Sequence, residues 1–421
     1  MRESVTIAVP GDKSISHRAL ILATLAQGRS RIRGILESED VLSTARVLRM
    51  LGANVPALSA EIEIDGTGFR SRSTPAGDVE CGNSGTTVRL LAGIVAGTHS
   101  VSARFTGDHS LSSRPMRRVA DPLTMAGARF EFERDDGLPM TVHGAQLNPM
   151  NIEMEIPSAQ VKSALLLAGL VSGVTVSVLE PVRSRDHTER MLRAMGATLQ
   201  SDGSKILLDP PSALNPLDIT VPGDPSSASY LAAAGVLAGL REVLLPDVCL
   251  NDTRTRFFRA LAVMGADFRL NYERFVGGEP VGTIRARPSG LVGIGILPQD
   301  IPSMIDELPL LCCVAACAAG TTVVSGAAEL RVKESDRLTL VVENLRSLGA
   351  DAEEQADGML VRGATRPLRG LVRTAGDHRI AMSFGVLSRL PGNNIEIDDR
   401  ACVAISYPGF WSDLDRATSP A

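Results

Sequence analysis

The chain has 421 residues, a formal net charge of -5 and an aromatic content of only 3%. This composition argues against a basic, aromatic-rich surface for nucleic acid. No apolar run reaches the ~18 residues of a membrane span, and the first residues do not resemble a signal peptide, so we expect a cytoplasmic protein without a membrane partner. Six Cys and six His occur without metal-ligand spacing, so we expect neither a metal site nor a cofactor.

The first predicted helix starts within residues 10–20, PGDKSISHRAL. Lys13 and Ser14 lie in its first turn, and Arg18 lies one turn after Ser14 on the same face. Because the dipole disfavours cations at a helix N-terminus, their presence there calls for an anion that offsets the cost. The segment therefore predicts either an anion site or, more simply, a solvated basic face.

Five further helix starts recur along the chain, each with polar or charged side chains just before an apolar stretch. They are residues 83–86 (NSGT), 157–160 (PSAQ), 223–226 (GDPS), 305–307 (IDE) and 376–379 (GDHR). A helix N-terminus offers unpaired N–H groups and a partial positive charge. Several of them converging with Lys and Arg would bind a small, highly charged substrate.

A second helix in five of the six units closes on a similar phrase that contains glycine and alanine. The glycines are Gly52, Gly127, Gly196, Gly265 and Gly349. We expect each to end its helix with positive φ. Alternating segments such as residues 174–179 and 395–398 predict strands, so each unit is predicted as strand, helix, strand, helix, then one or two strands. Such self-similarity indicates a repeat fold.

A second concentration of charge lies in residues 331–338, RVKESDRL. Lys333 and Arg337 stand at i and i+4 with Glu334 between them. The segment is either an exposed helix with ion pairs or an anion site in which Glu334 carries a proton. Just before it, Cys312, Cys313 and Cys317 lie in a predicted apolar helix, where we expect small core side chains.

The phrase Pro-Gly-Asp at residues 10–12 returns at residues 222–224, about half the chain later. The six units therefore pair into two similar lobes of three units each. We expect residues 11–223 to form the N-terminal lobe, and residues 1–10 with 224–421 to form the C-terminal lobe. A cleft between lobes is the usual place for a ligand.

Six segments together resemble the motifs of the 5-enolpyruvylshikimate-3-phosphate (EPSP) synthase family, the 3-phosphoshikimate 1-carboxyvinyltransferases. They are residues 12–18 (DKSISHR), 82–86 (GNSGT), 110–116 (SLSSRPM), 158–163 (SAQVKS), 331–337 (RVKESDR) and 377–382 (DHRIAM). The resemblance implies transfer of the enolpyruvyl group of phosphoenolpyruvate to the 5-hydroxyl of shikimate 3-phosphate. It also implies a monomeric mixed α/β fold, an αβ prism (inside-out α/β barrel) with three βαβαββ repeats in each of two lobes.

The same resemblance assigns the site residues. Shikimate 3-phosphate would be held by Lys13, Ser14, Arg18, Ser158, Ala159, Gln160, Ser184, Arg185, Asp306 and Lys333. Phosphoenolpyruvate would be bound by Lys13, Gly85, Arg114, Gln160, Arg337 and Arg379. Asp306 would be the base near the attacking hydroxyl and Glu334 the acid, and Lys13, which would bind both substrates, would be the third catalytic residue. Two positions depart from some members: Glu329 replaces an Asn, and Ile405 replaces a Lys.

Two rival interpretations remain at this point. The related UDP-N-acetylglucosamine enolpyruvyl transferases place a reactive Cys shortly before an Arg-Pro pair, whereas residues 107–115 contain none. A non-catalytic binding scaffold of the same fold would be favoured by loss of Asp306 or Glu334, and both are present. In the resembling family glyphosate competes with phosphoenolpyruvate, and tolerant members carry Ala where this chain has Gly85, which predicts sensitivity.

Overall fold

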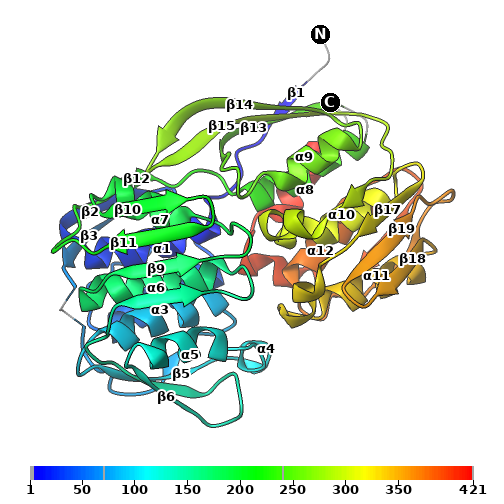
Figure 1. The fold of residues 1–421 in the computed structure, drawn as a ribbon. Helices are drawn as coiled ribbons and strands as arrows, with labels where there is room; N and C mark the ends of the chain where they lie inside the picture. Colours follow the sequence, from blue (N-terminus) through cyan, green and yellow to red (C-terminus); the bar gives the residue numbers. More distant parts are fainter. Residues whose placement is uncertain (1–3, 70–71, 239–240, 420–421) are drawn as a thin grey trace. The chain divides into compact units, whose positions relative to one another are not determined.

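A computed structural model describes residues 4–69, 72–238 and 241–419, which form helices and mostly short strands (Figure 1). The chain divides into two units. One contains Gly11–Val221 together with Val276–Glu279, and the other contains Met1–Pro10, Pro222–Phe275 and Pro280–Ala421. Residues 1–3 of the predicted C-terminal lobe lie outside the described part of the chain.

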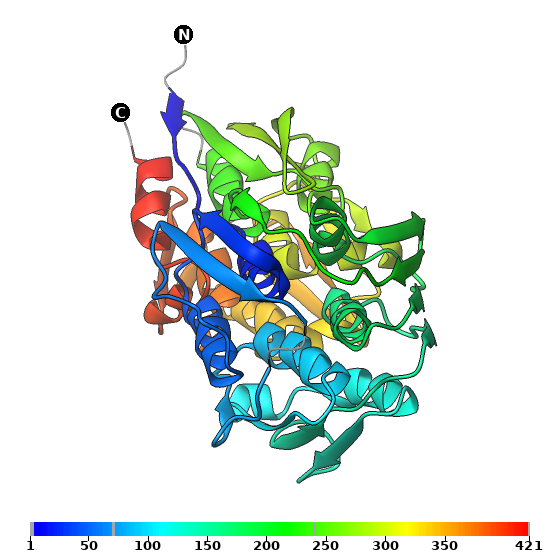
Figure 2. The same ribbon diagram turned by 90° about the vertical axis from the view of Figure 1, so that its left-hand side faces the viewer.

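The unit that begins at Gly11 contains three sheets, with strand orders β12-β2-β3, β4-β5-β7-β6 and β8-β9-β11-β10. In each sheet the first two strands are parallel and the remaining neighbours antiparallel. Figure 2 shows strands of the first sheet, in blue, lying over helices of the same unit. The strands are β2 (Gln27–Arg33), β3 (Glu61–Thr67), β4 (Val79–Glu80), β5 (Ser102–Thr106), β6 (Arg129–Phe132), β7 (Met140–His143), β8 (Met150–Glu153), β9 (Val176–Leu179), β10 (Thr198–Asp202), β11 (Lys205–Asp209) and β12 (Asp218–Thr220).

The helices of this unit are α1 (Lys13–Leu25), α2 (Glu39–Met50), α3 (Gly85–Gly97), α4 (His109–Ser112), α5 (Arg117–Met125), α6 (Ala159–Ser172) and α7 (His187–Ala194). Helices α3 and α6 touch through backbone. A Cβ on Gly93 would lie 2.4 Å from the Ala164 carbonyl oxygen, and one on Gly97 would lie 2.3 Å from that of Ala168. Only glycine allows this approach, which places the start of α3 beside the start of α6.

The other unit contains sheets with strand orders β1-β13-β15-β14, β16-β17-β19-β18 and β20-β21. Its strands are β1 (Ser4–Thr6), β13 (Glu242–Cys249), β14 (Asp267–Val276), β15 (Glu279–Arg287), β16 (Gly295–Ile296), β17 (Thr321–Val324), β18 (Asp351–Gln355), β19 (Gly358–Arg362), β20 (Arg369–Val372) and β21 (Asn394–Ile397). Its helices are α8 (Pro225–Leu237), α9 (Arg256–Val263), α10 (Leu308–Ala315), α11 (Arg337–Ser347), α12 (His378–Ser388) and α13 (Phe410–Thr418), with 3-10 turns η1 (Pro298–Ser303), η2 (Ile305–Glu307), η3 (Ala328–Val332) and η4 (Ala401–Ile405).

The five predicted helix stops are confirmed, since the glycine after α2, α5, α7, α9 and α11 has a φ between 90° and 118° in every case. The connection between β14 and β15 was not anticipated. Gly278 lies against Arg190, and Glu279 accepts a hydrogen bond from the ring of His187 at 2.8 Å. These contacts explain why Val276–Glu279 belong with the unit that begins at Gly11.

Residues 305–307 lie directly before the apolar helix α10, as expected, and form a 3-10 turn. Of the two alternatives for residues 331–338, the exposed helix is wrong for residues 333–336, because the Asp336 carboxylate accepts from the Thr339 N–H and α11 begins only at Arg337. One expectation about the cysteines was also wrong. Cys312 and Cys313 are buried in α10, but Cys317 lies beyond its end with an exposed side chain.

Candidate active site

The start of α1 carries its own negative charge. Asp12 Oδ1 accepts from the Ile15 N–H at 2.8 Å, and Lys13 Nζ lies 2.9 Å from Asp40 Oδ2 in α2. The anion that the sequence called for at this helix start is therefore supplied in part by the protein. Lys13 keeps 17% of its side chain exposed.

Arg18 is held rigidly one turn further along α1. Its Nε donates to Thr188 Oγ1 at 2.7 Å, Nη1 to the Ser14 carbonyl at 3.0 Å and Nη2 to Ser163 Oγ at 2.8 Å. A guanidinium has five N–H donors, so these bonds fix its plane and leave donors for a bound anion. Burial lowers the pKa of Arg18 to about 10, while the Glu189 carboxylate opposes this effect. Arg18 is therefore a cation at neutral pH.

The starts of α3 and α6 share a hydrogen-bonded link. Gln160 accepts from Arg89 Nη1 at 2.6 Å through Oε1, and its Nε2 donates to Thr86 Oγ1 at 2.9 Å. Ser158 caps α6, accepting from the Val161 N–H at 3.4 Å, and Ala159 is the first residue of that helix. Helices α3 and α6 are thus joined by backbone contacts along their length and by side-chain hydrogen bonds at their N-termini.

Arg114 reaches the start of α3 from the loop before α5. Its Nη2 donates to Asn83 Oδ1 at 2.6 Å and to Ser110 Oγ at 3.2 Å. A Cβ on Gly85 would lie 3.0 Å from Arg89 Nη1 and 3.3 Å from Arg114 Nη1. The absence of a side chain at Gly85 therefore lets two guanidinium groups approach the N–H groups of α3. The structure brings Gly85, Arg114 and Gln160 together at the start of α3, and a helix N-terminus favours anions.

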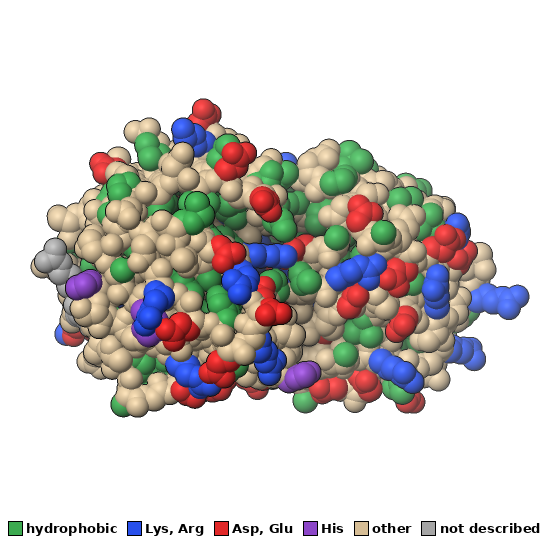
Figure 3. Space-filling model, turned by 60° about the horizontal axis from the view of Figure 1, so that its bottom comes forward, with side chains coloured by type: hydrophobic (Ala, Val, Ile, Leu, Met, Phe, Trp, Pro, Cys, Tyr) green, Lys and Arg blue, Asp and Glu red, His purple; other side chains and the backbone are tan. Residues whose placement is uncertain are grey.

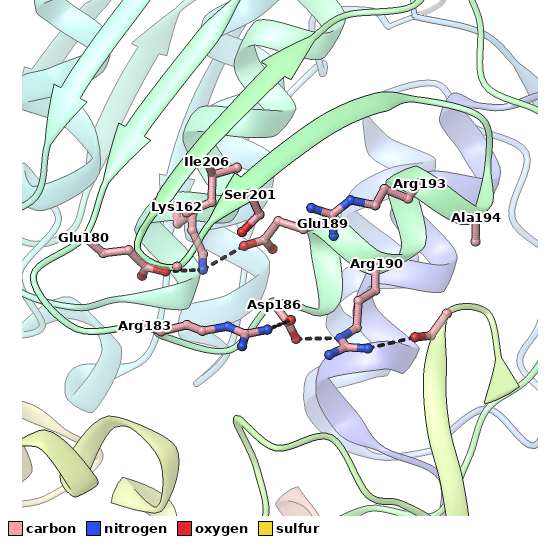
Figure 4. A pocket seen from close by; sticks show the side chains of 12 residues that line it. Lys162, Glu180, Arg183, Asp186, Glu189, Arg190, Arg193, Ala194, Ser201 and Ile206 are labelled. Atoms are coloured by element: carbon pink, nitrogen blue, oxygen red, sulfur yellow. Dashed lines mark hydrogen bonds and ion pairs between the residues drawn. The ribbon is translucent and has the colours of Figure 1, made fainter. Parts of the chain in front are cut away.

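Ser184 and Arg185 lie in an irregular segment between β9 and α7. Ser184 Oγ donates to Glu180 Oε2 at 2.5 Å, and Glu180 Oε1 accepts from Lys162 Nζ at 2.7 Å. Arg185 lies close enough to Arg18 to act against the protonation of its guanidinium. A pocket of about 580 Å³ adjoins this segment, and Figure 4 shows Asp186 between Arg183 and Arg190 on its wall.

The unit that contains Pro222–Phe275 places three carboxylates around Arg337, whose side chain is 1% exposed. Its Nε donates to Asp377 Oδ2 at 2.8 Å, Nη2 lies 2.7 Å from Glu334 Oε2, and Nη1 lies 3.5 Å from Asp306 Oδ1. Burial acts to lower the pKa of Arg337, but Asp377 and Glu334 outweigh it and the pKa is raised. One fixed cation thus bridges Asp306 and Glu334.

Arg379 and Lys333 surround the same carboxylates. Arg379 Nη2 lies 4.0 Å from Asp306 Oδ2, and its Nη1 donates to the Tyr230 hydroxyl at 3.5 Å. Burial lowers the pKa of Lys333, against the opposing effect of Asp306 and of Glu329. Glu329 therefore acts as a negative neighbour of Lys333. Ile405 packs against the hydrophobic core.

Sequence reasoning assigned no role to the partners that orient these groups: Asp40, Asn83, Arg89, Tyr230 and Asp377. Asn83 and Asp377 lie inside the motifs, which was a usable signal. Asp40, Arg89 and Tyr230 had no such signal. Asp40 lies 27 residues from its partner Lys13, and Tyr230 lies 149 residues from its partner Arg379.

The face of the molecule in Figure 3 intersperses acidic and basic side chains, and neither sign forms a stripe on that face. Across residues 4–69, 72–238 and 241–419, no cluster of three or more His, Cys, Asp or Glu is arranged to hold a metal ion. None of the helices described is long and apolar enough to cross a membrane.

Comparison with known proteins gives concordant results. The sequence model of EPSP synthase (3-phosphoshikimate 1-carboxyvinyltransferase) matches residues 2–414. The 3-phosphoshikimate 1-carboxyvinyltransferase of Gloeobacter violaceus is 46% identical over 99% of this chain and 96% of its own, and that of a Sulfurihydrogenibium species is 44% identical over 98% and 97%. The EPSP synthase structure from Acinetobacter baumannii is similar with a TM-score of 0.85 and 38% identity, covering 99% of this chain and 96% of its own. The enolpyruvyl transferase NikO from Streptomyces tendae, at 18% identity, shares the fold with a TM-score of 0.75 and covers 99% and 95%.

Proposed function

Because the chain belongs to the EPSP synthase (3-phosphoshikimate 1-carboxyvinyltransferase) family, we propose that the residue groups described above perform that family's reaction. The enzyme transfers the enolpyruvyl group of phosphoenolpyruvate to the 5-hydroxyl of shikimate 3-phosphate and releases phosphate. This reaction belongs to the shikimate pathway, which leads to chorismate and the aromatic amino acids. The roles of individual residues follow from the geometry of each group.

Shikimate 3-phosphate is bound, in this proposal, by Lys13, Ser14, Arg18, Ser158, Ala159, Gln160, Ser184, Arg185, Asp306 and Lys333. The fixed guanidinium of Arg18 supports this role, because a cation whose position is set before binding loses little entropy when the anion arrives. Ser14 and Ala159 lie at helix starts, where backbone N–H groups favour anions.

Phosphoenolpyruvate is bound, in this proposal, by Lys13, Gly85, Arg114, Gln160, Arg337 and Arg379. The grouping of Gly85 with Arg114 and Gln160 supports a site for one carboxylate or phosphate. Arg337 and Arg379 belong to the other unit, where both lie beside Asp306 and can supply charge to the same anion.

The observation that carries the catalytic assignment is the bridge that Arg337 makes between Asp306 and Glu334. We assign Asp306 as the base that takes the proton of the 5-hydroxyl as its oxygen bonds to C2 of phosphoenolpyruvate. Glu334 is the acid that protonates C3, which gives a tetrahedral ketal. Removal of a methyl proton by Glu334 or a neighbouring base then restores the double bond as the C2–O bond to phosphate breaks. Lys13 and the arginines stabilise the charge that develops.

The finer architecture is part of the proposal. We propose two lobes, each an αβ prism (inside-out α/β barrel) of three βαβαββ repeats, in a cytoplasmic monomer. The repeat is supported by the parallel pair that opens each of the six sheets in the described part of the chain, including β1 with β13 and β20 with β21. Sedimentation equilibrium of the purified protein tests the monomer, and a dimer mass would refute it.

Phosphate release tests the function. Purified protein mixed with phosphoenolpyruvate and shikimate 3-phosphate should release one phosphate per enolpyruvyl group transferred, and either substrate alone should release none. UDP-N-acetylglucosamine in place of shikimate 3-phosphate is the matched control and should give no release. If phosphate were released with phosphoenolpyruvate and UDP-N-acetylglucosamine but not with phosphoenolpyruvate and shikimate 3-phosphate, the assignment would be refuted.

A further inference from the structure

A buried cluster of three charges joins Lys162, Glu180 and Glu189 in the unit that begins at Gly11 (Figure 4). Lys162 Nζ lies 2.7 Å from Glu180 Oε1 and 2.7 Å from Glu189 Oε1. The three residues are 0%, 1% and 2% exposed. Lys162 lies in α6, Glu180 follows β9, and Glu189 lies in the first turn of α7. One ammonium in α6 therefore ties down both ends of the segment from residue 180 to residue 189.

This segment carries the two groups assigned to the 3-phosphate, Ser184 and Arg185. It has neither helix nor strand between β9 and α7, so its own backbone does not hold it in place. Glu180 supplies the missing support. While its Oε1 accepts from Lys162, its Oε2 accepts from the hydroxyl of Ser184 at 2.5 Å and from the Ser184 N–H at 3.2 Å.

The cluster also reaches Arg18 through the residues next to it in sequence. Ser163 follows Lys162, and Thr188 precedes Glu189; their hydroxyls lie 2.7 Å apart, and each accepts from the Arg18 guanidinium. The same two segments therefore orient the loop with Ser184 and the guanidinium of Arg18. One ammonium shared by two carboxylates leaves the cluster with an excess of negative charge, which stabilises the buried cation at Arg18.

We propose that Lys162 and Glu180 are positioning residues that set the 3-phosphate site before shikimate 3-phosphate binds, a role that rests on the proposed function. In this role both side chains act through neighbouring residues. Glu180 holds Ser184, and Lys162 holds Glu180 and Glu189 at a fixed distance from the start of α6. Binding then does not have to order the segment, and the free energy of the phosphate contacts is retained as affinity.

Glu180→Gln is the test, because the amide keeps the shape of the side chain. Its single oxygen can face either Lys162 or the donors of Ser184, so one of the two links is lost. Lys162 would still be paired with Glu189, which protects the fold. By calorimetry we expect affinity for shikimate 3-phosphate to fall at least tenfold, and affinity for shikimate, which lacks the phosphate, to change less than twofold. The KM for phosphoenolpyruvate should also change less than twofold.

Glu242→Gln is the matched control. Glu242 is 7% exposed, pairs with Arg285 and Arg287, and belongs to the other unit, so it should leave both affinities unchanged. A second test combines Glu180→Gln with Ser184→Ala. If Glu180 acts through Ser184, the double variant should bind shikimate 3-phosphate no more than twofold more weakly than the weaker single variant.

Three outcomes would overturn the proposal: equal losses for shikimate 3-phosphate and shikimate, a lower melting temperature with unchanged affinities, or independent effects of the two substitutions. Wild-type protein in the same experiments separates this failure from failure of the function. If wild type binds shikimate 3-phosphate and releases phosphate while Glu180→Gln behaves like it, only the positioning role is refuted. If wild type does neither, the proposed function falls and the positioning role falls with it.

Discussion

Replacing Gly85 with Ala should weaken the binding of glyphosate more than the binding of phosphoenolpyruvate, although the two compete for the same site in this family. Gly85 is the first residue of α3 and has no positive φ, so Ala fits its backbone. The new methyl would meet Arg89 Nη1 at 3.0 Å and Arg114 Nη1 at 3.3 Å. Arg89 cannot move freely, because it donates to Gln160 at 2.6 Å and to the Pro115 carbonyl at 3.0 Å. We therefore expect the methyl to reduce the space that remains for a bound ligand.

The size of the effect follows from that crowding. Overpacking by one methyl costs roughly 1–3 kcal/mol, which corresponds to about ten- to hundredfold in affinity. Because glyphosate is the longer ligand, we expect its inhibition constant to rise at least tenfold more than the KM for phosphoenolpyruvate. Steady-state inhibition assays on wild type and Gly85→Ala measure both quantities. Equal rises in the two constants, or a wild type indifferent to millimolar glyphosate, would refute this reasoning.

Three further predictions concern proton transfer, pH and helix packing. Asp306→Ala should lower turnover at least ~100-fold and leave the affinity for shikimate 3-phosphate within tenfold, and near-normal turnover would remove Asp306 as the base. The pKa of His17 is lowered well below 6.5 by burial and by the charges of Lys13 and Arg18. The unfolded state therefore takes up a proton that the folded state does not, and the free energy of unfolding falls as the pH drops through about 6.5. Urea unfolding at pH 8 and pH 5.5 should show a smaller acid loss for His17→Gln, and an equal loss would contradict the assignment. Gly93→Ala should destabilise the protein by about 1–3 kcal/mol and weaken binding of both substrates, because its methyl would lie 2.4 Å from the Ala164 carbonyl oxygen. Gly77→Ala is the control, since nothing lies within 4 Å of its Cβ. Equal melting temperatures of the two variants would argue against a close backbone contact at Gly93.

Local patterns in the sequence predicted the helix starts and stops well, because those are decided within one or two turns. Lys13 begins α1 as expected, and Gly196 has a positive φ just after α7. The exposed helix that was one alternative for Lys333 and Arg337 is wrong for an equally local reason, since Asp336 caps α11 and the helix begins only at Arg337. The spacing of apolar residues in this segment did not reveal that Asp336 would cap α11.

Long-range partners could not be predicted in this way. Any of several acidic residues could have paired with Lys13, and only the packing of α2 against α1 selects Asp40. The placement of Asp377 under Arg337 similarly depends on how α12 lies against α11. The resemblance to a family named the groups that touch substrate, whereas the structure adds those that orient them.

The contact between α3 and α6 has a consequence for how this site tolerates change. Main-chain atoms at Gly93 and Ala164 set the separation of the two helices, so the separation does not depend on which apolar side chains fill the surrounding core. Side chains elsewhere in that core can therefore be exchanged for others of similar volume without altering the interval between Gly85 and Gln160. The two helices therefore hold the binding groups at their N-termini at a fixed distance. Substitutions in the core can change the stability of the protein during evolution while this distance is conserved.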